Sequence, residues 1–163
     1  MARKRPSVAH GLVLIDKPAG LTSHDVVYKL RGHFHEKRIG HAGTLDPDAT
    51  GLLVIGVGNV TRLFRFMADM DKTYSCEIVF GSETDSLDDS GAVTATHVMA
   101  PPDIERVREI IAEQFMGEIL QVPPMISALK VDGVRLHKLA RQGIEVERPA
   151  RPITIFSFDV EPT

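Results

Sequence analysis

Residues 38–58, RIGHAGTLDPDATGLLVIGVG, join a glycine-rich loop to an uninterrupted apolar run. The run at residues 52–57 consists of aliphatic residues and glycine, and it predicts a buried strand. In the preceding loop, predicted at residues 40–50, Asp46 stands directly before Pro47, whose ring biases the preceding residue toward an extended conformation. We therefore expect a carboxylate held against an apolar strand, shielded from water and in need of a partner.

Asp46 has two interpretations when only its neighbours are considered. Catalytic acids and nucleophiles are typically found as carboxylates in such surroundings. The alternative is that Asp46 only hydrogen-bonds its own turn, in which Thr44 and Pro47 also lie. Gly40 and Gly43 favour a site, because a backbone without side chains allows a ligand to approach closely. The loop alone leaves both interpretations open.

Outward from this loop, hydrophobic periodicity and turn signals predict a mixed order of elements. Thr22 or Ser23 is expected to cap a helix whose inward face carries Val26, Val27 and Leu30, and Asn59 to cap another. We expect strands at residues 11–15, 52–57, 73–80, 91–98 and 153–160, an extended piece at 119–124, a hairpin turn at Asp132-Gly133, and helices at 22–33, 59–67, 103–115 and 135–142. This order predicts an α+β fold with a mixed, largely antiparallel sheet flanked by helices.

The composition is that of a globular protein, with 43% hydrophobic and 25% charged residues among 163. The lone Cys76 excludes a disulfide within the chain and a Cys-rich zinc site, and no segment is apolar over the length of a membrane helix. Net charge is −3, but residues 1–40 carry eight Lys/Arg against three Asp/Glu. That asymmetry suits either an anionic polymer such as nucleic acid or a solvated basic tail.

Other site patterns are weak. The segment Gly56-Val57-Gly58-Asn59 lacks the third glycine of a dinucleotide loop, because Thr61 takes its place. The acidic residues 83–91 fail the spacing of a calcium loop and predict a hairpin loop instead. The histidines are too scattered for a metal site. We expect no metal and no cofactor.

Several motifs in register resemble the TruB family of tRNA pseudouridine synthases. The resemblance covers essentially all 163 residues and rests on long motifs in the same order. They are GHAGTLDP at 40–47 with ATG at 49–51, DKPAGLTS at 16–23, DKTY at 71–74, QVPPMISALK at 121–130, ARQG at 140–143 and RPI at 151–153.

This resemblance implies an isomerase that converts the uridine numbered 55 in the T loop of tRNA to pseudouridine without a cofactor. Asp46 matches the family's essential aspartate, either as nucleophile at C1′ or as the base at C2′. The base must be flipped out of its stack, and His41 matches the histidine that fills the vacated space. Tyr74 matches the tyrosine that stacks on the flipped uracil.

The resemblance also implies further contacts with the substrate. Lys17 and Lys130 are expected to contact the site or the RNA backbone, and Arg38 and Lys37 to contact phosphates. Family members continue with strands that carry a Lys-Gly-Thr-Tyr-Ile-Arg-like motif, whose arginine pairs with the aspartate, and usually with an RNA-binding domain. We therefore expect residues 1–163 to form the N-terminal portion of a pseudouridine synthase catalytic domain, incomplete at its C-terminus.

Two rival interpretations remain beside a free-standing cytoplasmic, monomeric tRNA enzyme. One is an RNA-binding or RNA-folding fragment of the same family that keeps loop recognition without turnover. The retained Asp46, His41 and Tyr74 speak against it, because a fragment without chemistry has no need of Asp46. The other is the branch of the family that works in guide-RNA particles, which predicts added segments for protein partners.

Overall fold

The computed structural model describes residues 9–124, 130–131, 134–135, 144 and 146–163. The chain divides into two compact units, residues 1–75 and 76–163, and each is described by itself. All strand pairs found in the described residues are antiparallel, which confirms the predicted α+β class. Across these described ranges, no helix combines the length and the apolar character that a bilayer crossing requires.

The first unit contains a three-stranded sheet in the order β1-β3-β2. β1 is Gly11–Lys17, β3 is Gly51–Val57 and β2 is Ile39–Ala42. The strands predicted at 11–15 and 52–57 are confirmed. The prediction of a loop from residue 40 onward is wrong at its start, because β2 pairs with β3 up to Ala42. Gly40 and Gly43 are atypical of strands, so the sequence did not predict β2, which is stabilised by its pairing with β3.

Helix α1, Ser23–Phe34, begins where the sequence predicts. Thr22 is its N-cap, and the Thr22 and Asp25 side chains accept hydrogen bonds from each other's backbone N–H in a capping box. The predicted inward residues Val26 and Val27 are buried, and Leu30 packs against them. The hydrogen bonds from Thr22 hold the pKa of Asp25 below its ordinary value.

The Thr22 cap predicts a stability change that depends on pH. Thr22→Ala is expected to lower the free energy of unfolding by about 1 kcal/mol at neutral pH. The pKa of Asp25 is lowered in the folded state, so the ionised Asp25 carboxylate stabilises the fold at pH values above its ordinary pKa of 3.8. This stabilisation is lost as the pH falls through the lowered pKa. Urea titrations at neutral and acidic pH measure it. If Thr22→Ala lowered the free energy of unfolding by the same amount at neutral and at acidic pH, the account would be contradicted.

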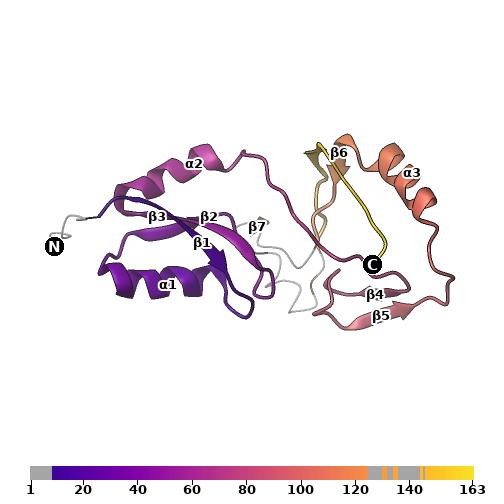
Figure 1. Cartoon of the computed structure of the whole chain (residues 1–163), viewed down its shortest axis with the longest axis horizontal. Helices are drawn as coiled ribbons and strands as arrows, with labels where there is room; N and C mark the ends of the chain where they lie inside the picture. The colour runs from indigo at the N-terminus through magenta and orange to yellow at the C-terminus, as the bar shows by residue number, and fades with distance from the viewer. Residues whose placement is uncertain (1–8, 125–129, 132–133, 136–143, 145) are drawn as a thin grey trace. The chain divides into compact units, whose positions relative to one another are not determined.

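Helices lie on both faces of this sheet (Figure 1). On the face of α1, six buried side chains form the core: Val26, Val27, Ile39, Leu53, Ile55 and Val57. The opposite face carries the 3₁₀ helix η1, Gly58–Leu63, and the short helix α2, Phe64–Met67. The predicted helix at 59–67 is therefore mostly 3₁₀, and Asn59 is not its cap, since η1 starts after Val57 without a side-chain cap.

The ring of Phe64 lies over a pair of glycines in the sheet. Gly40 of β2 faces Gly56 of β3 in the register. A Cβ on Gly56 would lie 2.6 Å from Phe64 Cζ, and one on Gly40 would lie 3.3 Å from Phe64 Cε2. Gly40 was expected to open a turn to a ligand. It lies in a strand instead, and its lack of a side chain makes room for Phe64.

This packing predicts a large difference between two glycine substitutions. Gly56→Ala is expected to lower the free energy of unfolding by about 1–3 kcal/mol, because the methyl group overlaps Phe64. Gly32→Ala in α1 is the matched control, since its added Cβ meets nothing within 4 Å. We expect the control to be neutral or slightly stabilising, as helix propensity favours alanine. Thermal unfolding of both variants measures the difference, and equal melting temperatures would contradict it.

In the described part of the second unit, the structure shows three strand pairs and the helix α3. β4, Ser82–Thr84, pairs with β5, Val93–Thr96, and the acidic residues between them form the predicted hairpin loop. Helix α3, Ile104–Gln114, begins at the N-cap Asp103 as predicted and buries Ile111. Phe115, the C-cap of α3, is exposed.

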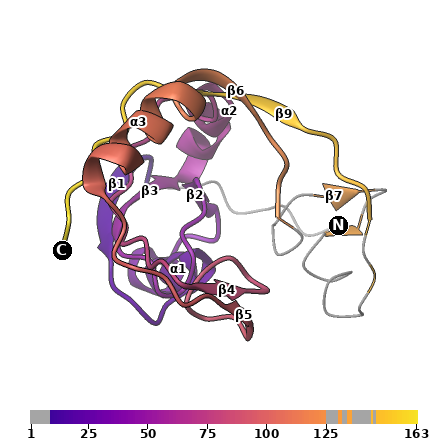
Figure 2. The same cartoon turned by 90° about the vertical axis from the view of Figure 1, so that its right-hand side faces the viewer.

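Two more pairs complete this unit. β6, Gly117–Gln121, follows α3 and pairs with β9, Arg151–Ile155, which runs beside it (Figure 2). β7, Lys130–Val131, pairs with β8, Val134–Arg135, on either side of the predicted turn at Asp132-Gly133, which itself lies outside the described residues. The strand predicted at 153–160 therefore lies earlier, at β9.

Two predicted elements are absent or lie elsewhere. Residues 73–80 alternate like a strand but are irregular and exposed, because no strand of the described residues pairs with them. A strand needs a neighbour to satisfy its backbone groups, and alternation does not supply one. The helix predicted at 135–142 is wrong at Arg135, which belongs to β8, and the rest of it lies outside the described residues.

Candidate functional site

The Asp46 loop is held on its N-terminal side by Ser23. The Ser23 hydroxyl donates to the carbonyl oxygen of Leu45 at 3.1 Å and accepts from the Leu45 N–H at 3.0 Å. Ser23 is the first residue of α1 and is buried, so helix and loop are joined at one point. Two hydrogen bonds to the same residue fix both the position and the orientation of the Leu45 backbone.

Lys17 holds the loop on the other side. Its ammonium group donates to the carbonyl oxygens of Leu21 at 2.7 Å, Pro47 at 2.9 Å and Pro18 at 3.0 Å. The Pro47 oxygen also accepts from the N–H of Gly20 at 2.9 Å. Lys17 is fully buried, and three bonds use all three of its N–H donors.

The family resemblance implied that Lys17 contacts the site or the RNA backbone. The structure gives Lys17 a contact with the site loop, through the Pro47 carbonyl oxygen, and a contact with RNA stays a prediction. The role of Lys17 here is to tie the end of β1 and the start of α1 to the loop. The sequence contained a signal for the burial of Lys17, because Lys17 follows Val13 and Ile15 at alternate positions of one strand face.

Asp46 lies between these two attachment points. Its backbone neighbours are fixed by Ser23 and Lys17, while its own side chain is exposed. Our expectation of a shielded carboxylate is therefore wrong for this chain. Within the described ranges, no hydrogen bond or ion pair reaches the Asp46 side chain. The geometry presents an acceptor-only group to solvent on a rigidly held turn.

The turn itself is shaped by His41 and Gly43. Gly43 has φ = +87°, a left-handed conformation that glycine adopts without strain. His41 Nδ1 hydrogen-bonds to the carbonyl oxygen of Gly43, and because a carbonyl only accepts, Nδ1 carries the proton. No described hydrogen bond uses the Nε2 edge of the ring. Thr44, the residue after Gly43, is exposed.

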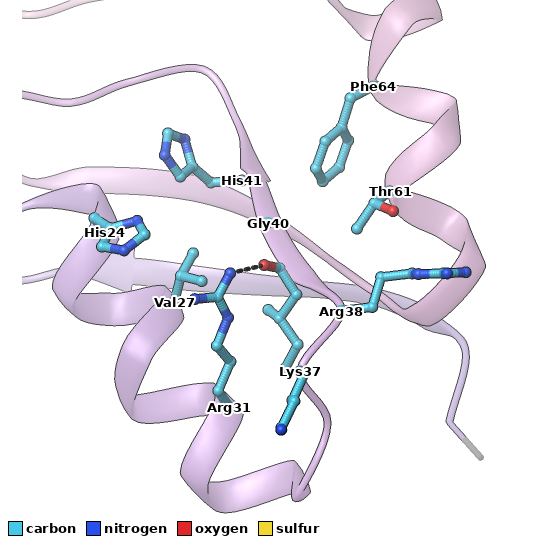
Figure 3. Close-up of a pocket in the computed structure, with 10 residues that line it drawn as sticks. His24, Val27, Arg31, Lys37, Arg38, Gly40, His41, Thr61 and Phe64 are labelled. Carbon is cyan, nitrogen blue, oxygen red and sulfur yellow. Dashed lines mark hydrogen bonds between the residues drawn. The ribbon is translucent and has the colours of Figure 1, made fainter. Parts of the chain in front are cut away.

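A pocket of about 460 Å³ lies beside β2 in the same unit (Figure 3). Lys37, Arg38, Gly40 and His41 contribute to its lining. Arg38 Nη1 donates to Asn59 Oδ1 at 2.5 Å, which directs its side chain toward η1. The pocket thus joins the basic residues before the motif to His41 at the start of the Asp46 loop.

Two predicted site residues are not brought to this loop by any contact that the described residues show. Tyr74 lies in the irregular segment 71–80 with 71% of its surface exposed. Lys130 begins β7, and its side chain lies outside the described part. Both stay predictions. Over the described ranges, no cluster of three or more His, Cys, Asp or Glu residues is placed to hold a metal ion.

Comparison with known proteins gives a consistent result. The family model described as "TruB family pseudouridylate synthase (N terminal domain)" matches residues 31–162. A tRNA pseudouridine synthase B of Streptococcus gordonii is 49% identical over 151 residues, which cover 92% of this chain and 51% of that protein. The protein of the same name from Heliobacterium modesticaldum is 47% identical over 155 residues, covering 95% of this chain and 50% of the relative.

A solved structure shows the same fold. It is a crystal structure of a Cbf5-Nop10-Gar1 complex, matched with a TM-score of 0.56 at 22% identity. The match covers 93% of this chain and 36% of the chain compared. The chain spans about half the length of the curated relatives it matches.

Proposed function

The chain belongs to the TruB family of pseudouridylate synthases, and from that premise we propose that it converts uridine to pseudouridine in tRNA, with Asp46 as the essential carboxylate. The observation that carries the proposal is the placement of Asp46. Its side chain is exposed, while Ser23 and Lys17 hold the backbone on both sides of it. A group that must meet a ribose needs both access and a fixed position.

The reaction is an isomerisation, so it needs no oxidant or second substrate. The N1–C1′ bond breaks, the uracil turns, and C5 bonds to C1′. The proton on C5 leaves to solvent and N1 gains a proton, so the atoms balance. Asp46 serves either by attacking C1′ or by taking the proton at C2′, and both roles use an ionised carboxylate beside the ribose.

The substrate we propose is the T loop of tRNA, at the uridine numbered 55. The base must leave its stack, which costs a few kcal/mol. We assign His41 to fill the vacated space, because its Nδ1 is bound within the turn and its Nε2 edge is free for RNA. Tyr74 would stack on the flipped uracil, and Arg38 and Lys130 would contact the RNA. The support is the curated name shared by the matched relatives, tRNA pseudouridine synthase B.

We further propose a cytoplasmic protein that acts as a monomer without a cofactor. The competing candidate is an RNA-binding fragment of the same family that does not turn over. One observation favours that candidate, since none of the described residues places a cation against Asp46 to orient its charge.

Mapping the product separates the two candidates. A tRNA transcript is incubated with the chain, and pseudouridine is located by carbodiimide modification and reverse transcription. We expect one new stop, at the T-loop uridine, and none when that position carries cytidine. Modification at other uridines would overturn the T-loop assignment. Binding of tRNA without any product would support the fragment.

A further inference from the structure

We propose that the pocket beside β2 is a subsite for one phosphodiester of the RNA strand that enters the Asp46 loop. This rests on the proposed function and adds a contact to it. The pocket is formed within the first unit by α1, the segment before β2, β2 itself, η1 and α2. His41 lines the pocket from β2, and its Nδ1 hydrogen-bonds to the Gly43 carbonyl oxygen in the loop that leads to Asp46, so pocket and loop are neighbours.

The lining of the pocket is strongly cationic. Three residues are positively charged at neutral pH, Arg31, Lys37 and Arg38, and His24 and His41 add imidazole donors. None of the ten described lining residues is acidic. Polyanions are bound by such clusters, because each neutralised phosphate releases counterions from the nucleic acid.

The donors lie on two walls around an apolar floor. On the wall formed by α1, Arg31 Nη2 donates to the Ile39 carbonyl oxygen at 3.0 Å, which fixes the guanidinium in place (Figure 3). Its Nε is buried and has no hydrogen-bond partner among the described residues, so this wall holds a donor without an acceptor. Arg38 is fixed by Asn59 on the wall formed by η1.

The floor favours a nucleotide over a lone anion. Val27, Gly40 and Phe64 contribute apolar surface between the charged walls. A volume of about 460 Å³ exceeds the need of a single ion and suits a phosphate with a flanking ribose. The RNA backbone supplies a phosphate at every nucleotide, and the pocket shares His41 with the segment that leads to Asp46.

Lys37 allows a clean test, because its side chain is exposed and has no hydrogen bond to another residue in the described part of the chain. Lys29 is the matched control, an exposed lysine of α1 outside the lining. Lys37→Ala is expected to weaken tRNA binding about fivefold and to lower the slope of log Kd against log salt by about one. Lys29→Ala is expected to leave that slope unchanged. Fluorescence anisotropy with labelled tRNA over a range of salt concentrations measures both.

A second arm identifies the phosphate. Single methylphosphonate replacements remove one charge at a time from a T-stem-loop RNA. One replacement is expected to weaken binding to the unaltered chain and to have a smaller effect on Lys37→Ala, because part of the same contact is already lost. Additive losses at every position would overturn the subsite. So would competition by inorganic phosphate as strong as that by RNA, since the pocket would then hold a free anion.

The two proposals fail in different ways. Equal salt slopes for Lys37→Ala and Lys29→Ala would reject the subsite even if pseudouridine forms. A slope that depends on Lys37, with no pseudouridine formed, would leave the subsite standing and reject the proposed catalysis. A chain that binds no tRNA at all would reject the subsite outright.

Discussion

Asp46→Asn is expected to lower the rate of pseudouridine formation by on the order of 10³-fold or more, because the amide can neither attack C1′ nor take a proton. The fold should be unaffected. The Asp46 carboxylate is exposed and makes no hydrogen bond or ion pair with any described residue, so its neutral isostere removes no packing. Nucleoside chromatography of digested tRNA measures the product, and thermal unfolding checks the fold.

Asp48 provides a matched control in the same loop. It is also exposed and lies two residues on, so Asp48→Asn makes the same change of charge in nearly the same surroundings. We expect this variant to keep most of the activity and the same dependence of tRNA binding on salt. A loss of turnover equal in the two variants would mean that the negative charge of the loop, rather than the Asp46 carboxylate, supports the reaction.

Lys17→Met is expected to cause the largest loss of stability, about 3 kcal/mol or more. Methionine keeps the length and the apolar stem but removes all three hydrogen bonds. The Pro47 oxygen keeps its bond from Gly20, whereas the Lys17 bonds to Pro18 and Leu21 have no replacement among the described hydrogen bonds. Urea titration of the free energy of unfolding measures the loss.

The matched control and a conservative variant separate stability from loop position. Lys29→Met changes an exposed lysine and should leave the free energy of unfolding within a few tenths of a kcal/mol. Lys17→Arg keeps the charge and donors in a bulkier group. We expect it to fold, with a lower kcat because the Asp46 loop shifts, and with little change in the affinity for tRNA. Full activity in folded Lys17→Arg or Lys17→Met would show that Lys17 does not position the loop.

The local elements of the first unit were predictable because their signals are local. The Thr22 cap directly precedes the apolar face of α1 in the sequence. The aliphatic run of β3 is typical of a buried strand. β2 was not predictable, because Gly40 is compatible with a strand only once Gly56 and the Phe64 ring are its neighbours. The strand predicted at residues 73–80 was wrong for the opposite reason. Apolar and polar residues alternate there as in a strand, but no described strand pairs with this segment.

The motif in the sequence predicts which residues form the candidate site, and the structure shows what holds them in place. Asp46, His41 and Gly43 were selected from one motif, and the structure shows His41 hydrogen-bonded to Gly43 at the start of the segment that leads to Asp46. The roles of Ser23 and Lys17 depend on hydrogen bonds between residues 22 and 30 positions apart, which no local pattern reveals. The exposure of Asp46 is likewise seen only in the folded chain.

The most direct test of the central claim uses tRNA with a single tritiated uridine, labelled at C5 and placed at the T-loop position. Forming the C5–C1′ bond releases this tritium to water, so release reports the chemistry at one known base. The account predicts release by the 163-residue chain and none by Asp46→Asn. Release that persists in Asp46→Asn, while both proteins bind tRNA equally, would contradict the claim that Asp46 is the catalytic carboxylate.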